Sequence, residues 1–99
     1  MNQPCEDTNG PRFELGRITV TPAALSALEA ADVQGLLLLA KHIHGDWSEL
    51  AEHDRLQNEL AVLLGLRVLS SYPLPDGKKI WVITEADRSA TTILLPGEY

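Results

Sequence analysis

The sequence has almost no cysteine, no long apolar run and no surplus of basic residues, and each absence excludes a class of protein. Its one cysteine, Cys5, cannot form a disulfide within the chain, so the reducing cytoplasm is the expected compartment. The longest apolar run, Leu36–Ala40, is far shorter than the roughly 20 residues of a transmembrane helix. The N-terminus lacks a basic cluster followed by an apolar segment, so we expect neither a signal peptide nor membrane association.

The charge balance is acidic, with 14 Asp and Glu against 8 Lys and Arg and a net charge of −6. Non-specific binding to nucleic acids depends on neutralisation of phosphates by Lys and Arg, so a general nucleic-acid-coating role is disfavoured. Two interpretations of the acidity stay open. It can serve solubility alone, or it can present an acidic surface that mimics a polyanion and occupies the basic groove of a partner.

A chain of 99 residues that is 44% hydrophobic has the size and composition of one globular domain. The first 14 residues are mostly polar and contain the breaker sequence Asn9-Gly10-Pro11. We therefore expect a flexible N-terminal arm over residues 1–14 and a single folded domain over residues 15–99.

The first two-thirds of this domain has the pattern of helices. After a short strand-like segment, Arg17–Val20, Thr21 and Pro22 have the residue types of an N-cap and a first helical position, so a helix is expected over 22–31. A second helix, over 36–44, is apolar on nearly every side and should be the most buried one. Apolar residues continue at helical spacing up to Gly65, which predicts a third helix over 55–64.

The third helix has two marked features. Asp54 and Gln57 have the spacing of a capping box at its start. Four leucines form a stripe at positions i, i+4, i+7 and i+8, which predicts that this side faces the core. They are Leu56, Leu60, Leu63 and Leu64.

After Gly65 the period changes from helical to two, which indicates strands over 66–72, 79–85 and 90–95. Short turns join them, so they should pair as an antiparallel meander. The expected fold is α+β. Two to three N-terminal helices pack on one face of a three-stranded antiparallel β-meander, with Arg17–Val20 as a candidate fourth strand.

His42, near the end of the second helix, is a candidate general acid or base because the imidazole pKa lies near neutrality. The alternative is a structural role in which the ring complements the helix dipole. His42 and His44 are two residues apart and point to different sides of a helix, so no metal site is expected. No cofactor-binding motif is present either.

The turn before the last strand is unusually polar. It can form an anion cradle in which Arg88 supplies a fork of donors, or it can satisfy its own hydrogen bonds. The residues concerned are Glu85, Asp87, Arg88, Ser89, Thr91 and Thr92. Trp47, Tyr72 and Lys79 are further binding candidates. Their structural alternatives are a core position, a half-buried sheet position and a solvated hairpin lysine.

Several segments together resemble a family of small proteins carried by plasmids, integrative elements and prophages. They are His42–Trp47, Arg67–Tyr72, and the run from Trp81 through Thr91-Thr92 and Leu95-Pro96 to Tyr99. The resemblance covers roughly residues 15–99. The family brings no settled activity, so the resemblance implies an accessory protein of a mobile element and no particular chemistry.

The order of elements, helices before an antiparallel sheet, resembles more remotely the metal-independent nucleases that include barnase, colicin toxins and RelE-type toxins. This resemblance implies an endoribonuclease site with His42 as acid or base. Arg88 and Thr92, or Thr91, would stabilise the phosphorane, and Glu85 would lie in the same pocket. His42 and Arg88 should then face one shared hollow.

The alternative hypothesis is a non-catalytic acidic interaction protein, such as an inhibitor of a host defence system or a nucleic-acid mimic. Its partner would be a protein of the host or of the mobile element, whereas the first hypothesis requires RNA. The sequence leaves both open.

Overall fold

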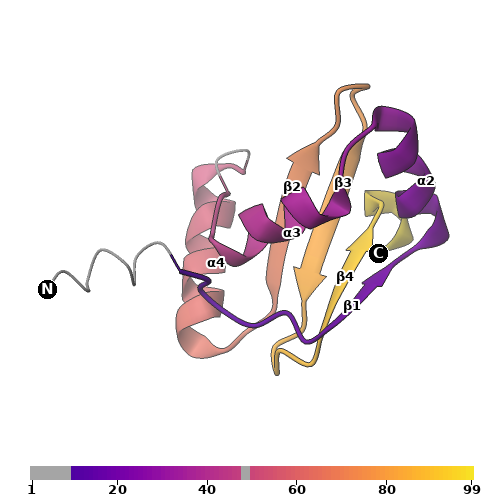
Figure 1. The fold of residues 1–99 in the computed structure, drawn as a ribbon. Helices are drawn as coiled ribbons and strands as arrows, with labels where there is room; N and C mark the ends of the chain where they lie inside the picture. The colour runs from indigo at the N-terminus through magenta and orange to yellow at the C-terminus, as the bar shows by residue number, and fades with distance from the viewer. Residues whose placement is uncertain (1–9, 48–49) are drawn as a thin grey trace, which may run out of the picture.

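The computed structural model describes residues 10–47 and 50–99. This part of the chain is an α+β fold of helices and one mixed sheet (Figure 1). The elements in chain order are β1 (Arg17–Val20), α2 (Pro22–Ala31), α3 (Gly35–Ile43), α4 (Glu52–Leu64), β2 (Val68–Pro73), β3 (Lys79–Thr84), β4 (Ala90–Leu94) and the 3-10 turn η1 (Pro96–Glu98).

The sheet has the strand order β1-β4-β3-β2. Strands β2, β3 and β4 form the predicted antiparallel meander. The expectation of a purely antiparallel sheet is wrong, because the candidate fourth strand β1 joins β4 in parallel, with Arg17 opposite Ala90. Parallel neighbours need a crossover connection in place of a hairpin, and here all three helices and two strands lie between them in the chain.

Helices α2 and α3 lie on one face of the sheet, and α4 lies along its β2 edge (Figure 1). Strand side chains alternate between the two faces, and those that face α2 and α3 are buried. They are Val68, Ser70, Tyr72, Ile80, Val82, Thr84, Thr91 and Ile93. On the other face the 3-10 turn η1 lies beside β3, and the C-terminal Tyr99 ring packs edge-on to Trp81, with 6.0 Å between the centroids.

Helix α2 has the bounds that the sequence predicted. Thr21 caps it, since its Oγ1 accepts a hydrogen bond of 3.1 Å from the backbone N–H of Ala24. Its buried side is made of Ala24, Ala27 and Leu28, which pack in the main core under β3 and β4.

Helix α3 lies close to its predicted position. It covers Gly35–Ile43, one residue earlier than expected. It has three buried residues of 9, against three of 10 in α2 and two of 13 in α4, so it is the most buried helix, as expected. Only one of its sides lies against the sheet, because Leu38 and Leu39 are buried whereas Leu36 and Leu37 are exposed.

Helix α4 is the largest departure from expectation. It begins at Glu52 with Ala51 as N-cap, so the predicted capping box is wrong and Asp54 lies within the first turn, where a negative charge suits the helix dipole. The four leucines of its stripe, which we call the leucine face, point to solvent and not to the core. Their exposed fractions are 56% for Leu56, 47% for Leu60, 78% for Leu63 and 63% for Leu64.

The opposite side of α4, with Asn58 and Ala61, faces the protein. The Asn58 side chain donates a 2.7 Å hydrogen bond to the carbonyl of Leu69 and accepts one of 3.2 Å from its N–H. The amide thus pairs with the backbone of β2 as the backbone of a neighbouring strand would. Ala61 is small enough for close packing against Trp47 and Val68. These contacts fix the rotation of α4 and turn its leucines outward.

Gly16 has a left-handed backbone (φ +64°), and a Cβ there would lie 2.4 Å from backbone atoms of Ser89. Gly16→Ala should therefore lower the free energy of unfolding by at least about 2 kcal/mol, measured by urea denaturation. Gly77→Ala, with φ +91° and nothing within 4 Å, should cost only the backbone strain, about 1–2 kcal/mol. Gly97→Ala, at a position with neither a positive φ nor a close neighbour, should leave the free energy of unfolding nearly unchanged. Equal effects of the three would contradict the close approach at Gly16.

Candidate functional site

His42 lies at the centre of a chain of buried hydrogen bonds. Its exposed fraction is 0%. Nδ1 is 2.5 Å from the Ser70 hydroxyl on β2, and Nε2 is 2.8 Å from the Thr84 hydroxyl on β3. Trp47 donates its indole N–H to the same Ser70 oxygen at 2.8 Å. Both nitrogens of the candidate acid or base are therefore bonded inside the protein.

The direction of this chain follows from counting donors, because each hydroxyl has one proton to give. Thr91 gives its proton to the carbonyl of Leu15 at 2.7 Å. The 2.7 Å contact between the Thr84 and Thr91 hydroxyls must then be a donation from Thr84. Thr84 in turn accepts from His42 Nε2–H. The count thus places a proton on Nε2. Because a fully buried ring disfavours a positive charge, Nδ1 is left without a proton and accepts that of Ser70.

The pKa of His42 agrees with this assignment. Burial of the ring, together with the smaller effect of the positive charge of Arg88, lowers this pKa from its ordinary value to about 3. An imidazole near neutral pH in this environment is uncharged. No buried side-chain nitrogen or oxygen in the described chain lacks a hydrogen-bond partner.

Phe13 lies between the two residues that the sequence predicted to share a hollow. Its ring stands edge-on to His42, with 5.0 Å between centroids and an interplanar angle of 89°. The guanidinium of Arg88 lies 5.4 Å from the centre of the same ring. His42 and Arg88 are thus brought near each other as expected, but an aromatic side chain from residues 10–16 fills the space between them.

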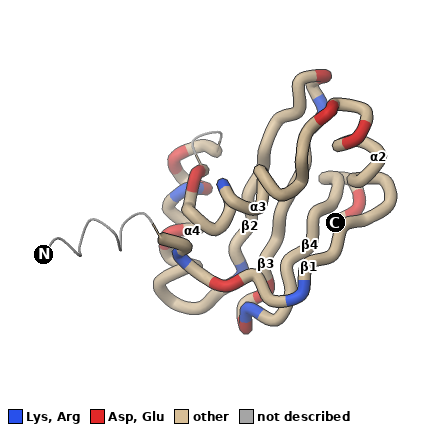
Figure 2. The backbone as a smooth tube through the Cα atoms, viewed as in Figure 1, with Lys and Arg blue, Asp and Glu red and all other residues tan. Residues whose placement is uncertain are grey.

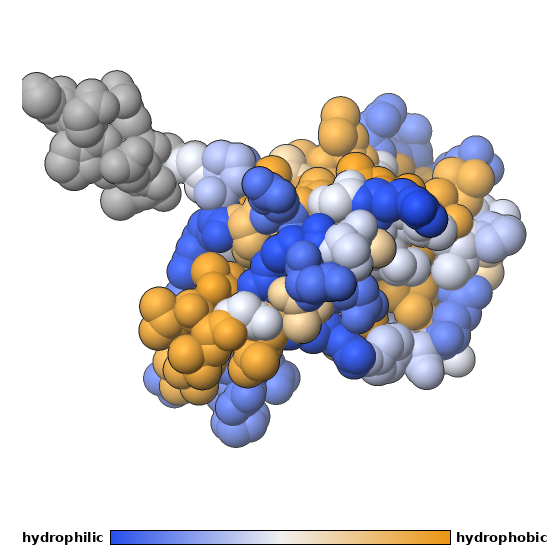
Figure 3. Space-filling model, turned by 90° about the horizontal axis from the view of Figure 1, so that it is seen from below, coloured by the Kyte–Doolittle hydropathy of each residue, from blue (hydrophilic) through white to orange (hydrophobic). Residues whose placement is uncertain are grey.

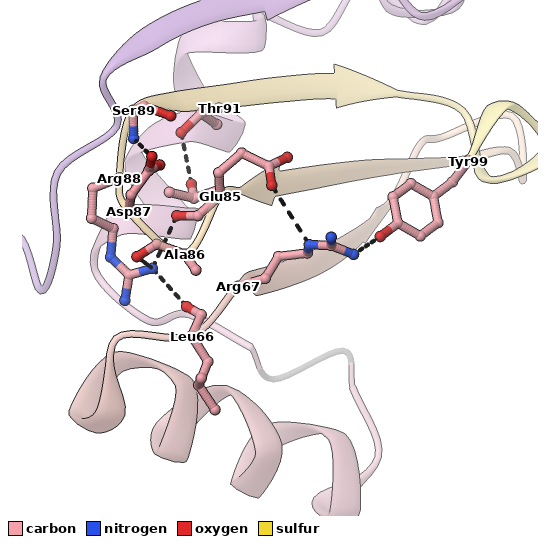
Figure 4. A network of polar contacts seen from close by, with 10 residues as sticks. Leu66, Arg67, Glu85, Ala86, Asp87, Arg88, Ser89, Thr91 and Tyr99 are labelled. Carbon is pink, nitrogen blue, oxygen red and sulfur yellow. Dashed lines mark hydrogen bonds and ion pairs between the residues drawn. The ribbon is translucent and has the colours of Figure 1, made fainter.

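Arg88 directs its donors at backbone carbonyls (Figure 4). It donates to Leu66 O at 2.6 Å and to Ala61 O at 3.1 Å, at the end of α4. It also donates to the carbonyls of Glu85 and Ala86 in its own turn. A cation at this position stabilises the helix C-terminus. Arg88 itself has a left-handed backbone, with φ 61°.

The remaining polar residues of the turn divide between the two faces of the sheet. Asp87 accepts the Ser89 N–H at 3.0 Å, and hydrogen bonds from Ser89 lower the pKa of Asp87. Thr91 belongs to the buried His42 chain, whereas Thr92, opposite Ile83, lies on the other face. Glu85 is 3.8 Å from Arg67, which also bonds the Tyr99 hydroxyl (Figure 4). The structure therefore does not bring Thr92 and Glu85 together with His42.

The other binding candidates have separate environments. Trp47 and Tyr72 are both buried, and the Tyr72 hydroxyl donates to the Asp46 carbonyl at 3.0 Å. Burial raises the pKa of Tyr72 to about 12. Lys79 is exposed and lines a groove.

That groove, of about 620 Å³, lies between α4 and the side of the sheet opposite α2 and α3. The half-buried Trp81 is in its wall, together with the cations Arg67 and Lys79 and the anion Asp54. Sequence reasoning missed this groove because it placed α4 on the face of the sheet and not at its edge. Its charges are of mixed sign and select no class of ligand.

The leucine face carries two connected hollows. One, of about 430 Å³, lies between Arg12 and the side chains Leu56, Leu60 and Leu63. The other, of about 480 Å³, lies between α4 and Gly45–Trp47. Leu56 and Glu59 line both. Figure 3 shows apolar side chains gathered over this end of the molecule. The signal for this surface in the sequence is the leucine stripe, whose periodicity predicts a side that faces the core.

Comparisons with family models, curated proteins and solved structures found no match for this chain. The resemblance to proteins of plasmids and prophages stays a prediction. Within residues 10–47 and 50–99, no group of three or more His, Cys, Asp or Glu side chains could hold a metal ion. No single helix of the described chain is long and apolar enough to cross a membrane. Only α2 and α3 pass that test as a pair, bent by 105°. Cys5 lies outside the described residues.

Ser70→Ala should lower the free energy of unfolding by about 2–4 kcal/mol, because it leaves His42 Nδ1 and the Trp47 N–H without partners in the core. Ser71→Ala, at the next position and on the other face of the sheet, should cost less than about 1 kcal/mol. Urea denaturation measures both. Equal losses for the two variants would show that the hydrogen bonds of Ser70 in the buried chain add nothing to stability beyond what an ordinary serine of the sheet contributes.

His42 should also make stability depend on pH. Its pKa is lower in the folded protein than in the unfolded chain, so acid favours unfolding. The contribution of the neutral ring to the free energy of unfolding is complete above about pH 6.5 and is lost as the pH falls toward 3. When the pH is lowered from about 7.5 to about 5, the titration of His42 should reduce the free energy of unfolding by about 2 kcal/mol. His42→Gln, which does not titrate, should lose correspondingly less over that range. Parallel pH profiles of the two proteins would contradict a neutral, buried His42.

Proposed function

We propose that this protein is a non-catalytic, acidic interaction protein that contacts its partner through the leucine face of α4. The observation that carries the proposal is the orientation of α4, which turns Leu56, Leu60, Leu63 and Leu64 to solvent. Monomeric soluble proteins rarely expose contiguous apolar patches beyond a few hundred Å², and larger ones mark interaction sites. The stripe is continuous along the helix, because its members repeat at helical spacing.

Two features give this surface the fixed shape that binding requires. The Arg12 guanidinium forms two hydrogen bonds with the Glu59 carboxylate, of 2.7 and 3.0 Å, and this pair borders the leucines. The rotation of α4 is fixed by Asn58 on its other side. A partner would therefore meet a preformed surface and lose little affinity to its ordering.

The endoribonuclease hypothesis receives less support from the geometry. A general base must come within hydrogen-bond reach of its substrate, and His42 has no exposed surface and two internal partners. Arg88 directs its donors at four backbone carbonyls. The predicted likeness to plasmid and prophage proteins favours a protein of the host or of the mobile element as the partner, such as a component of a defence system.

Capture of proteins from a host lysate should distinguish these functions. We expect a specific protein to be retained by the wild type and by Leu36→Glu, and its recovery to fall at least tenfold with Leu63→Glu. A carboxylate placed in an apolar contact loses its hydration, which costs several kcal/mol. Leu36 and Leu63 have nearly equal exposed fractions, 75% and 78%, so the two variants introduce the same charge at matched sites on different helices.

The control for folding is the thermal unfolding temperature, which should be similar for the two variants. Identical recovery with both would remove the leucine face from the function. Cleavage of total RNA in EDTA that is abolished by Arg88→Ala, with no protein retained, would replace this proposal by the endoribonuclease.

A further inference from the structure

We infer that the occupant of the leucine face is an amphipathic helix with basic residues along its polar edge. This inference rests on the proposed function and adds the chemistry of the partner. It draws on the spacing of the leucines and on the charges that border them.

The spacing fits a helix. Leu56, Leu60 and Leu63 follow one another at intervals of four and three residues, the pattern with which one helix packs along another. The hollow of about 430 Å³ beside them can receive the side chains of such a helix, as in other complexes in which a helix binds in a groove. A helix of 13 residues such as α4 is about 20 Å long, which sets the length of the partner segment.

The charges beside the leucines have a small acidic excess. The two hollows together are lined by three carboxylates, Asp46, Glu52 and Glu59, and by two cations, Arg55 and Arg12. Arg12 is the partner of Glu59. Figure 2 shows acidic and basic positions close together around α4, and the whole chain carries a net charge of −6. A partner with Lys or Arg beside its apolar stripe would complement this border and would be steered to it.

Two other occupants fit these charges or the composition less well. A second copy of the chain would bring another net charge of −6 and would place acidic borders against each other. The chain's own residues 1–9 contain one large apolar side chain, Met1, which cannot match four leucines. Complementary charge therefore favours a basic helix.

The probe for this inference is a fluorescently labelled peptide of about 14 residues, made of leucine and lysine, with leucine on one helical face. Its control is the same peptide with every lysine replaced by glutamate. By fluorescence anisotropy, the lysine peptide should bind the wild type with one-to-one stoichiometry. Its dissociation constant should be at least tenfold lower than that of the glutamate peptide. Binding should also weaken as salt is added.

The matched variants separate specific from non-specific attraction. Leu63→Glu makes the protein more acidic, so attraction by charge alone would strengthen binding of the lysine peptide. A leucine-face complex should instead be weakened at least tenfold. Leu36→Glu adds the same charge elsewhere and should change the dissociation constant by less than about twofold, as expected for a position outside the contact.

Three outcomes would overturn the inference. They are absence of peptide binding, equal binding by the two variants, and sedimentation as a dimer that Leu63→Glu dissociates. The last outcome would identify a second copy as the occupant. If the peptide fails while lysate capture still depends on Leu63, the proposed function stands and only the chemistry of the partner is wrong.

Discussion

The described fold depends on one internal chain of hydrogen bonds, centred on a neutral histidine. From Trp47 the chain runs through Ser70, His42, Thr84 and Thr91 to the carbonyl of Leu15. It connects α3, three strands and the segment before β1. Because the imidazole and each of the three hydroxyls both donate and accept, loss of one of them leaves its neighbours unsatisfied in a medium of low dielectric constant. These polar groups join the sheet to α3 and to residues 10–16.

The same constraint explains the turn between β3 and β4. Thr84 is the last residue of β3 and Thr91 the second residue of β4. Both belong to the buried chain, so the turn between them is held at both sides. Phe13 fits against His42, and Arg88 covers the Phe13 ring and reaches the end of α4. The turn thereby becomes a junction between the sheet, α4 and residues 10–16. Arg88 and Asp87, two of the residues that the sequence suggests for an anion cradle, make hydrogen bonds within the protein.

The parts of the fold that could be predicted are those set by local patterns. The period-two segments and their turns gave the meander, and Thr21 with Pro22 gave the start of α2. The parallel pairing of β1 had no local signal, since its partner β4 lies at the other end of the chain. The rotation of α4 was predicted wrongly because hydrophobic periodicity assigns leucines to the core. The Asn58 side chain instead forms hydrogen bonds with the edge of β2, and this contact turns the leucines to solvent. The burial of His42 depends on hydroxyls from Ser70 and Thr84, far away in the sequence.

The parallel pairing of β1 has a consequence for the order in which the molecule can form. Arg17 is opposite Ala90, and Leu15 accepts from Thr91 across 76 positions, so all of the chain from β1 to β4 must be synthesised before β1 can pair. Contacts between such distant positions are slow to form, since closing the intervening loop comes before any gain from pairing. During synthesis on the ribosome, the N-terminal strand emerges first and docks last. Until then the apolar edge of β4 and the side of α2 that packs on it stay open to chaperones or to misassembly.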